Sequence, residues 1–88
     1  MKEFKYTVND KNGLHARPAG MLAGLLKGYD SHITVSAMGK EADGKRLLSL
    51  MSLGARYGTE LIFTINGTDE EIVYEALKKH CEEKLNGE

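Results

Sequence analysis

Alternation of apolar and polar side chains predicts four β-strands in the chain. In residues 4–8, 33–37 and 60–66 every second side chain is apolar, as in a strand with one buried face. Residues 40–42 are a shorter candidate strand that follows a turn at Gly39-Lys40. Strands with a single apolar face predict an antiparallel sheet that is covered on one side.

Helical periodicity predicts three helices. Residues 16–28 repeat apolar side chains at helical spacing and end at a glycine, and residues 47–53 form a short helix closed by Gly54. The last helix follows Thr68, which we expect to be its N-cap, with Glu71 reaching back to it. The apolar stripe of this helix is expected to consist of Ile72, Val73, Ala76, Leu77 and Cys81.

The order of elements is β-α-β-β-α-β-α, which predicts an α+β fold with a four-stranded antiparallel sheet covered on one side by three helices. The 88 residues fit one domain over residues 1–88. Twelve basic and thirteen acidic residues exclude a strongly basic nucleic-acid-binding protein. Tyr6 and Phe63 fall on the helix-facing sides of their strands, which argues against an RNA-binding sheet, since that sheet stacks bases on exposed aromatic rings.

The single cysteine, Cys81, has no partner for an internal disulfide and no second thiol for a zinc site. Residues 1–6 lack the apolar run of a signal peptide, and no apolar stretch reaches the roughly 18 residues of a membrane span. We therefore expect a cytoplasmic protein without membrane insertion, and the sequence implies neither a metal nor a cofactor.

Residues 13–19, Gly-Leu-His-Ala-Arg-Pro-Ala, carry the candidate chemistry. They place His15 at the start of a helix, where Pro18 is tolerated in the first turn. The free backbone N–H groups of Ala16 and Arg17, the helix dipole and the Arg17 guanidinium favour a phosphoryl group beside His15. Because an imidazole is nucleophilic near neutral pH, His15 is predicted to accept that group.

The competing interpretation makes His15 an exposed helix cap and Arg17 a solubilising charge. Acid–base or metal catalysis would be indicated by a second histidine, a carboxylate or a zinc ligand paired with His15, and the sequence pattern identifies no such partner. His32 and His80 lie in separate elements without ligand-like spacing, and we expect them to be structural or surface residues.

Residues 13–19 resemble the active-site motif of the HPr family, the histidine-containing phosphocarriers of the phosphoenolpyruvate:sugar phosphotransferase system. Residues 51–54, Met-Ser-Leu-Gly, resemble the end of that family's short second helix. The resemblance covers essentially the whole chain and implies the family's open-faced β-sandwich. It also implies that His15 takes a phosphoryl group on Nδ1 from phosphorylated enzyme I and passes it to enzyme IIA, with Arg17 holding the phosphate. Such a protein is a phosphoryl carrier with a phosphohistidine intermediate, and not a free-standing enzyme.

The resemblance further implies a docking patch on the short second helix. Leu47, Leu48 and Met51 match exposed positions of the family, whereas Leu50 and Leu53 match its core. A helix this short cannot turn all five side chains inward. We expect four basic side chains to surround the patch and to steer acidic partners: Arg17, Lys27, Lys45 and Arg46. We also expect the protein to be a monomer.

The chain departs from the family at Arg46. Many members carry there a serine that HPr kinase phosphorylates, so we expect that regulation to be absent. The alternative function is an HPr-like regulatory binding protein, or a phosphorelay member not devoted to sugar uptake. Gly20 and Gly24 lie inside the first predicted helix, and the sequence does not decide whether they shape a partner-facing surface or are neutral.

Overall fold

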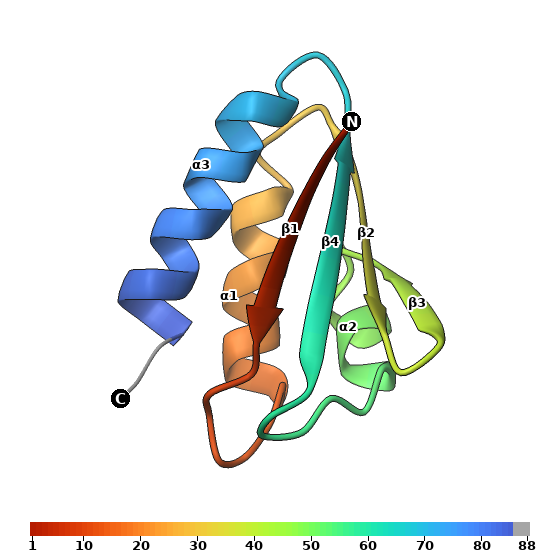
Figure 1. The fold of residues 1–88 in the computed structure, drawn as a ribbon, viewed down its shortest axis with the longest axis vertical. Coiled ribbons are helices and arrows are strands. Elements are labelled where there is room, and N and C mark those ends of the chain that lie inside the picture. Colours follow the sequence, from red (N-terminus) through yellow and green to blue (C-terminus); the bar gives the residue numbers. More distant parts are fainter. Residues whose placement is uncertain (86–88) are drawn as a thin grey trace.

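The computed structural model of the chain describes residues 1–85 and confirms the predicted fold. Its four strands form one antiparallel sheet in the order β1-β4-β2-β3, and three helices cover one face of the sheet (Figure 1). The elements, in chain order, are β1 (Lys2–Thr7), α1 (Ala16–Leu26), β2 (His32–Ala37), β3 (Lys40–Asp43), α2 (Leu47–Ser52), β4 (Glu60–Asn66) and α3 (Glu70–His80), which continues as a π-helical segment (Cys81–Leu85).

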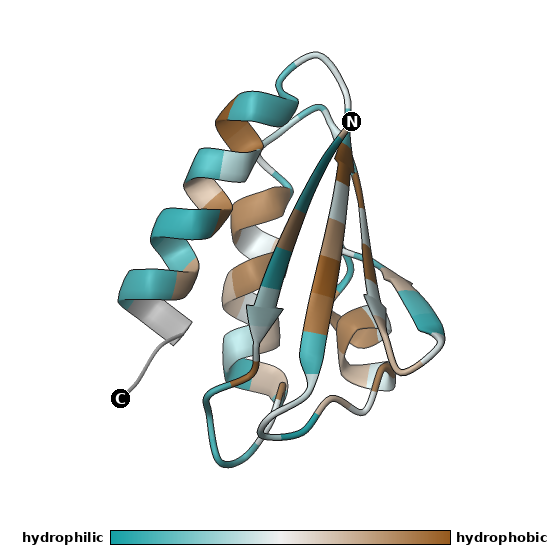
Figure 2. Cartoon of the chain, in the orientation of Figure 1, coloured by the Kyte–Doolittle hydropathy of each residue, from teal (hydrophilic) through white to brown (hydrophobic). Residues whose placement is uncertain are grey.

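The core lies between the sheet and the helices because alternate strand residues point toward the helices. Phe63 on the central strand β4 is opposite Phe4 of β1 and Val35 of β2, and Phe63 and Val35 are fully buried. The apolar residues of the strands alternate with polar ones along the ribbon, as Figure 2 shows. Tyr6 is half-buried and packs against the core, in agreement with its predicted helix-facing side.

The turn between β2 and β3 lies one residue earlier than predicted. Ala37 pairs with Lys40, so the two turn residues are Met38 and Gly39 and not Gly39-Lys40. Both have positive φ angles, 52° and 80°, as a two-residue hairpin turn of type I′ requires. The sequence suggested Gly39-Lys40 because glycine adopts a left-handed conformation easily and methionine rarely does.

The predicted stripe of α3 is wrong at Ile72, whose side chain is 62 % exposed. Val73, Leu77 and Cys81, spaced by four residues, are buried and define the inward face. Tyr74 packs beside them and forms a T-shaped pair with the Phe4 ring, with 5.7 Å between the ring centroids. With Val73 and Leu77 facing the core and Tyr74 against Phe4 of β1, Ile72 falls on the solvent side.

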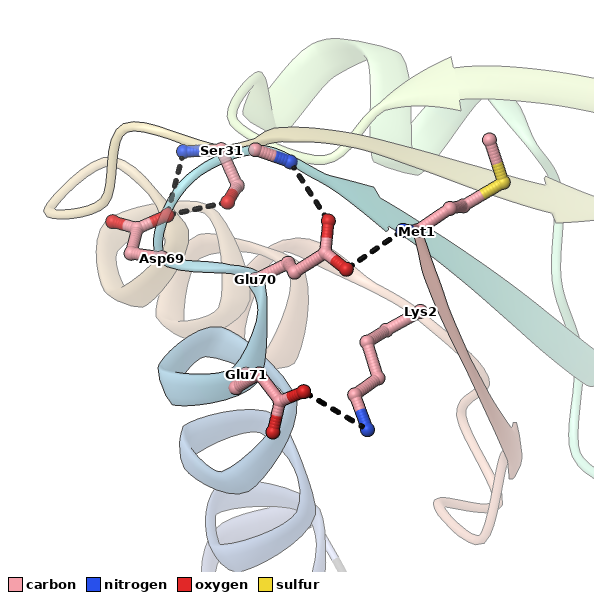
Figure 3. Close-up of polar contacts among 7 residues, drawn as sticks. Met1, Lys2, Ser31, Asp69, Glu70 and Glu71 are labelled. Carbon is pink, nitrogen blue, oxygen red and sulfur yellow. Dashed lines mark hydrogen bonds and ion pairs between the residues drawn. The ribbon is translucent and has the colours of Figure 1, made fainter.

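The N-cap of α3 is Asp69 and not Thr68, and the helix begins at Glu70. The Asp69 side chain makes no hydrogen bond to the helix that it precedes. Its carboxylate instead accepts bonds from the backbone N–H and hydroxyl of Ser31, in the segment that leads into β2 (Figure 3). With this contact the helix begins one residue later than the predicted capping box implies.

Glu70, and not Glu71, reaches back to the backbone before α3. Its Oε1 accepts the Gly67 N–H at 3.1 Å, and its Oε2 lies 2.7 Å from the ammonium group of Met1. Glu71 points outward, with Oε2 3.7 Å from Nζ of Lys2 (Figure 3). These contacts join the start of α3 to the start of β1.

No helix within residues 1–85 combines the length and the apolar character needed to cross a lipid bilayer.

Candidate functional site

The loop between β1 and α1 holds His15 in place through Gly13. Gly13 has φ +73°, and a Cβ there would lie 2.5 Å from the carbonyl oxygen of Ala55. Its N–H donates to the Asp10 carbonyl at 2.8 Å, and the next N–H, of Leu14, donates to Ala55 at 3.0 Å. Glycine is therefore required for the loop to lie against the segment before β4 and to present His15 at the start of α1.

His15 is the N-cap residue of α1, in an extended conformation with φ −86° and ψ −173°. Its carbonyl accepts the Ala19 N–H at 3.0 Å. Pro18 has no N–H, and the N–H groups of Ala16 and Arg17 donate no hydrogen bond within the described part of the chain. Two open donors at the positive end of the helix dipole therefore lie directly after His15.

His15 and Arg17 line one open cleft of about 880 Å³ at this end of the sheet. Tyr6 of β1, Met21 of α1 and Tyr57 before β4 contribute to its walls. The His15 side chain is 38 % exposed, and the exposed Arg17 makes no ion pair with any residue from 1 to 85. A guanidinium that has no internal partner is available for an external anion.

A carboxylate that was not predicted from the sequence also lies beside His15. Oδ2 of Asp10 lies 3.3 Å from Nε2 of His15, and Oδ1 of Asp10 accepts the Asn12 N–H at 2.8 Å. The Asn12 N–H, and after it the contacts with His15, hold the pKa of Asp10 below its ordinary value. An aspartate at the start of a turn uses one carboxylate oxygen to accept the N–H two residues later. The sequence pattern therefore predicts a partner for that oxygen but not for the second one.

The exposure of α2 matches the expected division between patch and core. Leu48 is 78 % exposed and Leu47 and Met51 are each 38 % exposed, whereas Leu50 and Leu53 are buried. We call the first three side chains the α2 patch. Its role in docking remains a prediction, since exposure alone does not identify a partner.

The basic residues expected around the patch differ in position and freedom. Arg17 and Lys27 lie at opposite ends of α1, which at 1.5 Å per residue separates them by about 15 Å. Arg46 is the exposed N-cap residue of α2, and its Nε lies 3.8 Å from Oδ2 of Asp43. Lys45 is not free to ring the patch, because its Nζ donates to the Tyr29 carbonyl at 2.6 Å.

Residues 2–83 match the protein family described as the PTS HPr component phosphorylation site. The phosphocarrier protein HPr of Xylella fastidiosa is 35 % identical over 86 residues, which cover 98 % of this chain and 97 % of that protein. The multiphosphoryl transfer protein of Salmonella typhimurium is 38 % identical over 76 residues, which cover 83 % of this chain but only 20 % of that longer protein.

Solved structures show the same likeness. The histidine-containing phosphocarrier protein of Mycoplasma superposes with a TM-score of 0.90 at 31 % identity, over 99 % of this chain and 100 % of the other. HPr from Thermoanaerobacter tengcongensis gives the same score at 34 % identity, over 100 % and 99 %. The fold and the sequence likeness agree on one class, the small phosphocarrier proteins. The chain belongs to the HPr family of the phosphotransferase system.

Proposed function

We propose that the chain carries a phosphoryl group on His15, which it accepts from phosphorylated enzyme I and passes to enzyme IIA components. One observation carries the proposal: His15 precedes the backbone N–H groups of Ala16 and Arg17, which donate no hydrogen bond within residues 1–85, in a cleft that also contains the Arg17 guanidinium, which makes no ion pair in that part of the chain. Backbone donors, a helix dipole and a guanidinium together favour a dianionic phosphoryl group. A histidine that only capped the helix would not need the guanidinium beside it.

In the proposed reaction, a ring nitrogen of His15 uses its lone pair to form a bond to phosphorus while the phosphorus–nitrogen bond to the donor histidine breaks. The transferred group then lies against the N–H groups of Ala16 and Arg17, and the Arg17 guanidinium balances its charge. In the second transfer, a nitrogen of the acceptor histidine on enzyme IIA forms a bond to phosphorus while the phosphorus–nitrogen bond to His15 breaks. The carrier is regenerated without a metal or a cofactor in the scheme.

The α2 patch is the proposed docking surface for both partners, with Arg17, Lys27 and Arg46 contributing positive charge. Methionine re-packs easily against different surfaces, so Met51 suits a carrier that must bind more than one protein. We propose that the chain acts as a single-domain monomer in the cytoplasm. Two relatives, HPr of Thermoanaerobacter tengcongensis and Crh of Bacillus subtilis, are described as dimers in their crystals, so sedimentation at several concentrations tests the monomer.

We propose that Arg46 removes regulation by HPr kinase, because no hydroxyl is present at the matching position. Arg46 also caps α2 poorly: its side chain makes no cap hydrogen bond and places a cation at the positive end of the helix. Arg46→Ser is expected to stabilise the fold by about 0.5–1 kcal/mol and to create a candidate kinase site. Efficient ATP-dependent phosphoserine in the natural sequence would contradict the proposal.

The phosphocarrier function is tested by mixing the protein with enzyme I and phosphoenolpyruvate and following acid-labile phosphorylation. We expect one phosphoryl group per chain and none on His15→Ala. Equal incorporation in the variant, or none in the natural sequence, would refute the proposal. Transfer from the phosphorylated protein to a panel of enzyme IIA proteins is then measured. Transfer to an enzyme IIA favours sugar transport, whereas no transfer to any of them favours the alternative, a regulatory or phosphorelay role.

A further inference from the structure

The contact between Asp10 and His15 orients the ring. Oδ2 of Asp10 lies 3.3 Å from Nε2 of His15, and both side chains are a little over one third exposed. Asp10 is itself fixed, because its Oδ1 accepts the Asn12 N–H and its carbonyl accepts the Gly13 N–H, both at 2.8 Å. The turn therefore holds the carboxylate at one nitrogen of the ring.

The protonation of the carboxylate decides which tautomer this geometry favours. An ionised carboxylate has no hydrogen to donate, so the contact is favourable only when Nε2 carries the proton. Asp10 is ionised at neutral pH, since its hydrogen bonds lower its pKa. In the neutral ring the lone pair is then on Nδ1, which becomes the nucleophile.

The same contact acts on the product of transfer. When the Nδ1 lone pair bonds to phosphorus and the donor's phosphorus–nitrogen bond breaks, the ring keeps its Nε2 proton and becomes positively charged. A carboxylate at Nε2 stabilises that charge. The protonated ring is also the better leaving group in the next transfer, because it departs as a neutral imidazole.

We propose that Asp10 is a positioning residue for the phosphoryl acceptor: it keeps the proton of His15 on Nε2, presents Nδ1 for attack, and favours the protonated phosphohistidine. This inference rests on the proposed phosphocarrier function. The role is indirect, because Asp10 contacts the ring on the side away from the reacting nitrogen.

The test compares Asp10→Asn with the natural sequence. Asparagine keeps an acceptor for the Asn12 N–H but loses the charge, so the turn is preserved, and thermal melting checks the fold. Glu3→Gln makes the same change of charge at an exposed residue of β1 and serves as the matched control. Other charged or titratable groups line the cleft and are left unchanged in every variant: Tyr6, Lys11, Arg17, Tyr57 and Glu83.

The first measurement uses the unphosphorylated protein. Nitrogen-15 NMR of the neutral His15 ring is expected to show the proton mainly on Nε2, and Asp10→Asn is expected to lower the tautomer ratio about threefold. The second measurement follows hydrolysis of the phosphorylated protein against pH, after loading by enzyme I or by phosphoramidate. The midpoint is expected to fall by about half a pH unit in Asp10→Asn and to stay constant in Glu3→Gln.

Unchanged tautomer ratio and midpoint in Asp10→Asn would overturn the positioning role while leaving the phosphocarrier function intact. Conversely, if enzyme I failed to phosphorylate the natural sequence while Asp10→Asn still shifted the tautomer ratio, the phosphocarrier function would be refuted and the orientation of the ring by Asp10 would stand. If Glu3→Gln moved the midpoint as far as Asp10→Asn does, net charge would explain the effect and the proposal would fail.

Discussion

Asp69 at the start of α3 accepts hydrogen bonds from both the backbone N–H and the hydroxyl of Ser31, a residue 38 positions earlier in the chain. It also accepts the Asp30 N–H at 2.8 Å. Close to this contact, a Cβ on Gly67 would lie 2.6 Å from the Cα of Ser31. The segment before β2 and the segment before α3 therefore meet backbone to backbone, and the Asp69 carboxylate joins them.

This contact predicts a dependence of stability on acid pH. The Ser31 hydroxyl, and after it the Asp30 N–H, lower the pKa of Asp69 from its ordinary value of 3.8. Because folding lowers the pKa, the contribution to stability is fully present above that value and is lost as the pH falls through the lower pKa of the folded state. Asp69→Asn is therefore expected to lower the melting temperature near neutral pH and to flatten its decrease in acid.

Asp30→Asn is the control for this experiment. It removes a neighbouring carboxylate but leaves the Asp30 N–H in place to bind Asp69. The acid profile of this control should follow that of the natural sequence. A steep acid decrease that persisted in Asp69→Asn would show that other groups control the acid stability.

The same contact shows where sequence patterns cease to be informative. The bounds of β4, Glu60–Asn66, could be predicted because alternation of side chains is a property of the segment itself. Thr68 could not be rejected as N-cap, because the partner that moves the helix start to Glu70 is Ser31, on another element. Local patterns predict an element, and distant partners decide the residue at which it begins.

The candidate site divides in the same way. His15 and the open N–H groups of Ala16 and Arg17 could be predicted, since a proline in the third helical position and a histidine before the helix are visible in the sequence. The contact of Asp10 with the ring could not be predicted, because it depends on how the turn folds back through Gly13. The backbone donors after His15 belong to the predicted helix itself, whereas the orientation of the ring depends on a turn outside that helix.

Gly24 in the middle of α1 is expected to limit the stability of the fold. A Cβ at Gly24 or at Gly20 would meet no atom within 4 Å, so alanine fits without strain. Gly24→Ala should raise the free energy of unfolding by about 1 kcal/mol and the melting temperature by roughly 4–8 °C. Chemical and thermal denaturation measure the change, and Gly20→Ala should behave similarly.

Gly13→Ala is the matched contrast, because Gly13 has φ +73° and its Cβ would collide with Ala55. It should lower the stability and disturb His15. A rise in KM for enzyme I in Gly20→Ala or Gly24→Ala would assign these glycines to the docking surface, and an unchanged KM would make them neutral. Destabilisation by Gly24→Ala would contradict the open space seen around it.

The α2 patch and the core beneath it should respond differently to substitution. Leu48 is 78 % exposed and Leu50 is fully buried. Leu48→Asp is expected to leave the melting temperature nearly unchanged and to raise the KM for enzyme I about tenfold, since about 1.4 kcal/mol is within the range lost at the more important residues of an interface. Leu50→Ala is expected to lower the free energy of unfolding by about 2–5 kcal/mol.

Steady-state transfer from enzyme I and equilibrium denaturation should be measured on both variants. Ile72→Asp on α3 is a suitable control, since Ile72 is also an exposed apolar residue but lies on another helix. If Ile72→Asp and Leu48→Asp raised the KM equally, apolar exposure in general, and not the α2 patch, would explain the effect.

Cys81, directly after α3, should be an unreactive thiol in the folded protein. Cys81 is only 2 % exposed. Its burial, together with a smaller effect of Glu82, raises the pKa of the thiol to about 12. Thiolate is the reactive form, so labelling by iodoacetamide at mildly alkaline pH should be at least about a hundredfold slower than in the denatured chain. Labelling that does occur requires the end of α3 to open, so its rate reports that opening.

Lys5→Cys in a Cys81→Ser background provides an accessible thiol on the exposed side of β1 for comparison. If α1 and the end of α3 open together, Gly24→Ala should slow the labelling of Cys81. If Cys81 becomes accessible only by global unfolding, Leu50→Ala should accelerate the labelling. Rapid labelling of Cys81 in the natural sequence, at the rate of the Lys5→Cys thiol, would mean that the last turn of α3 is open under native conditions.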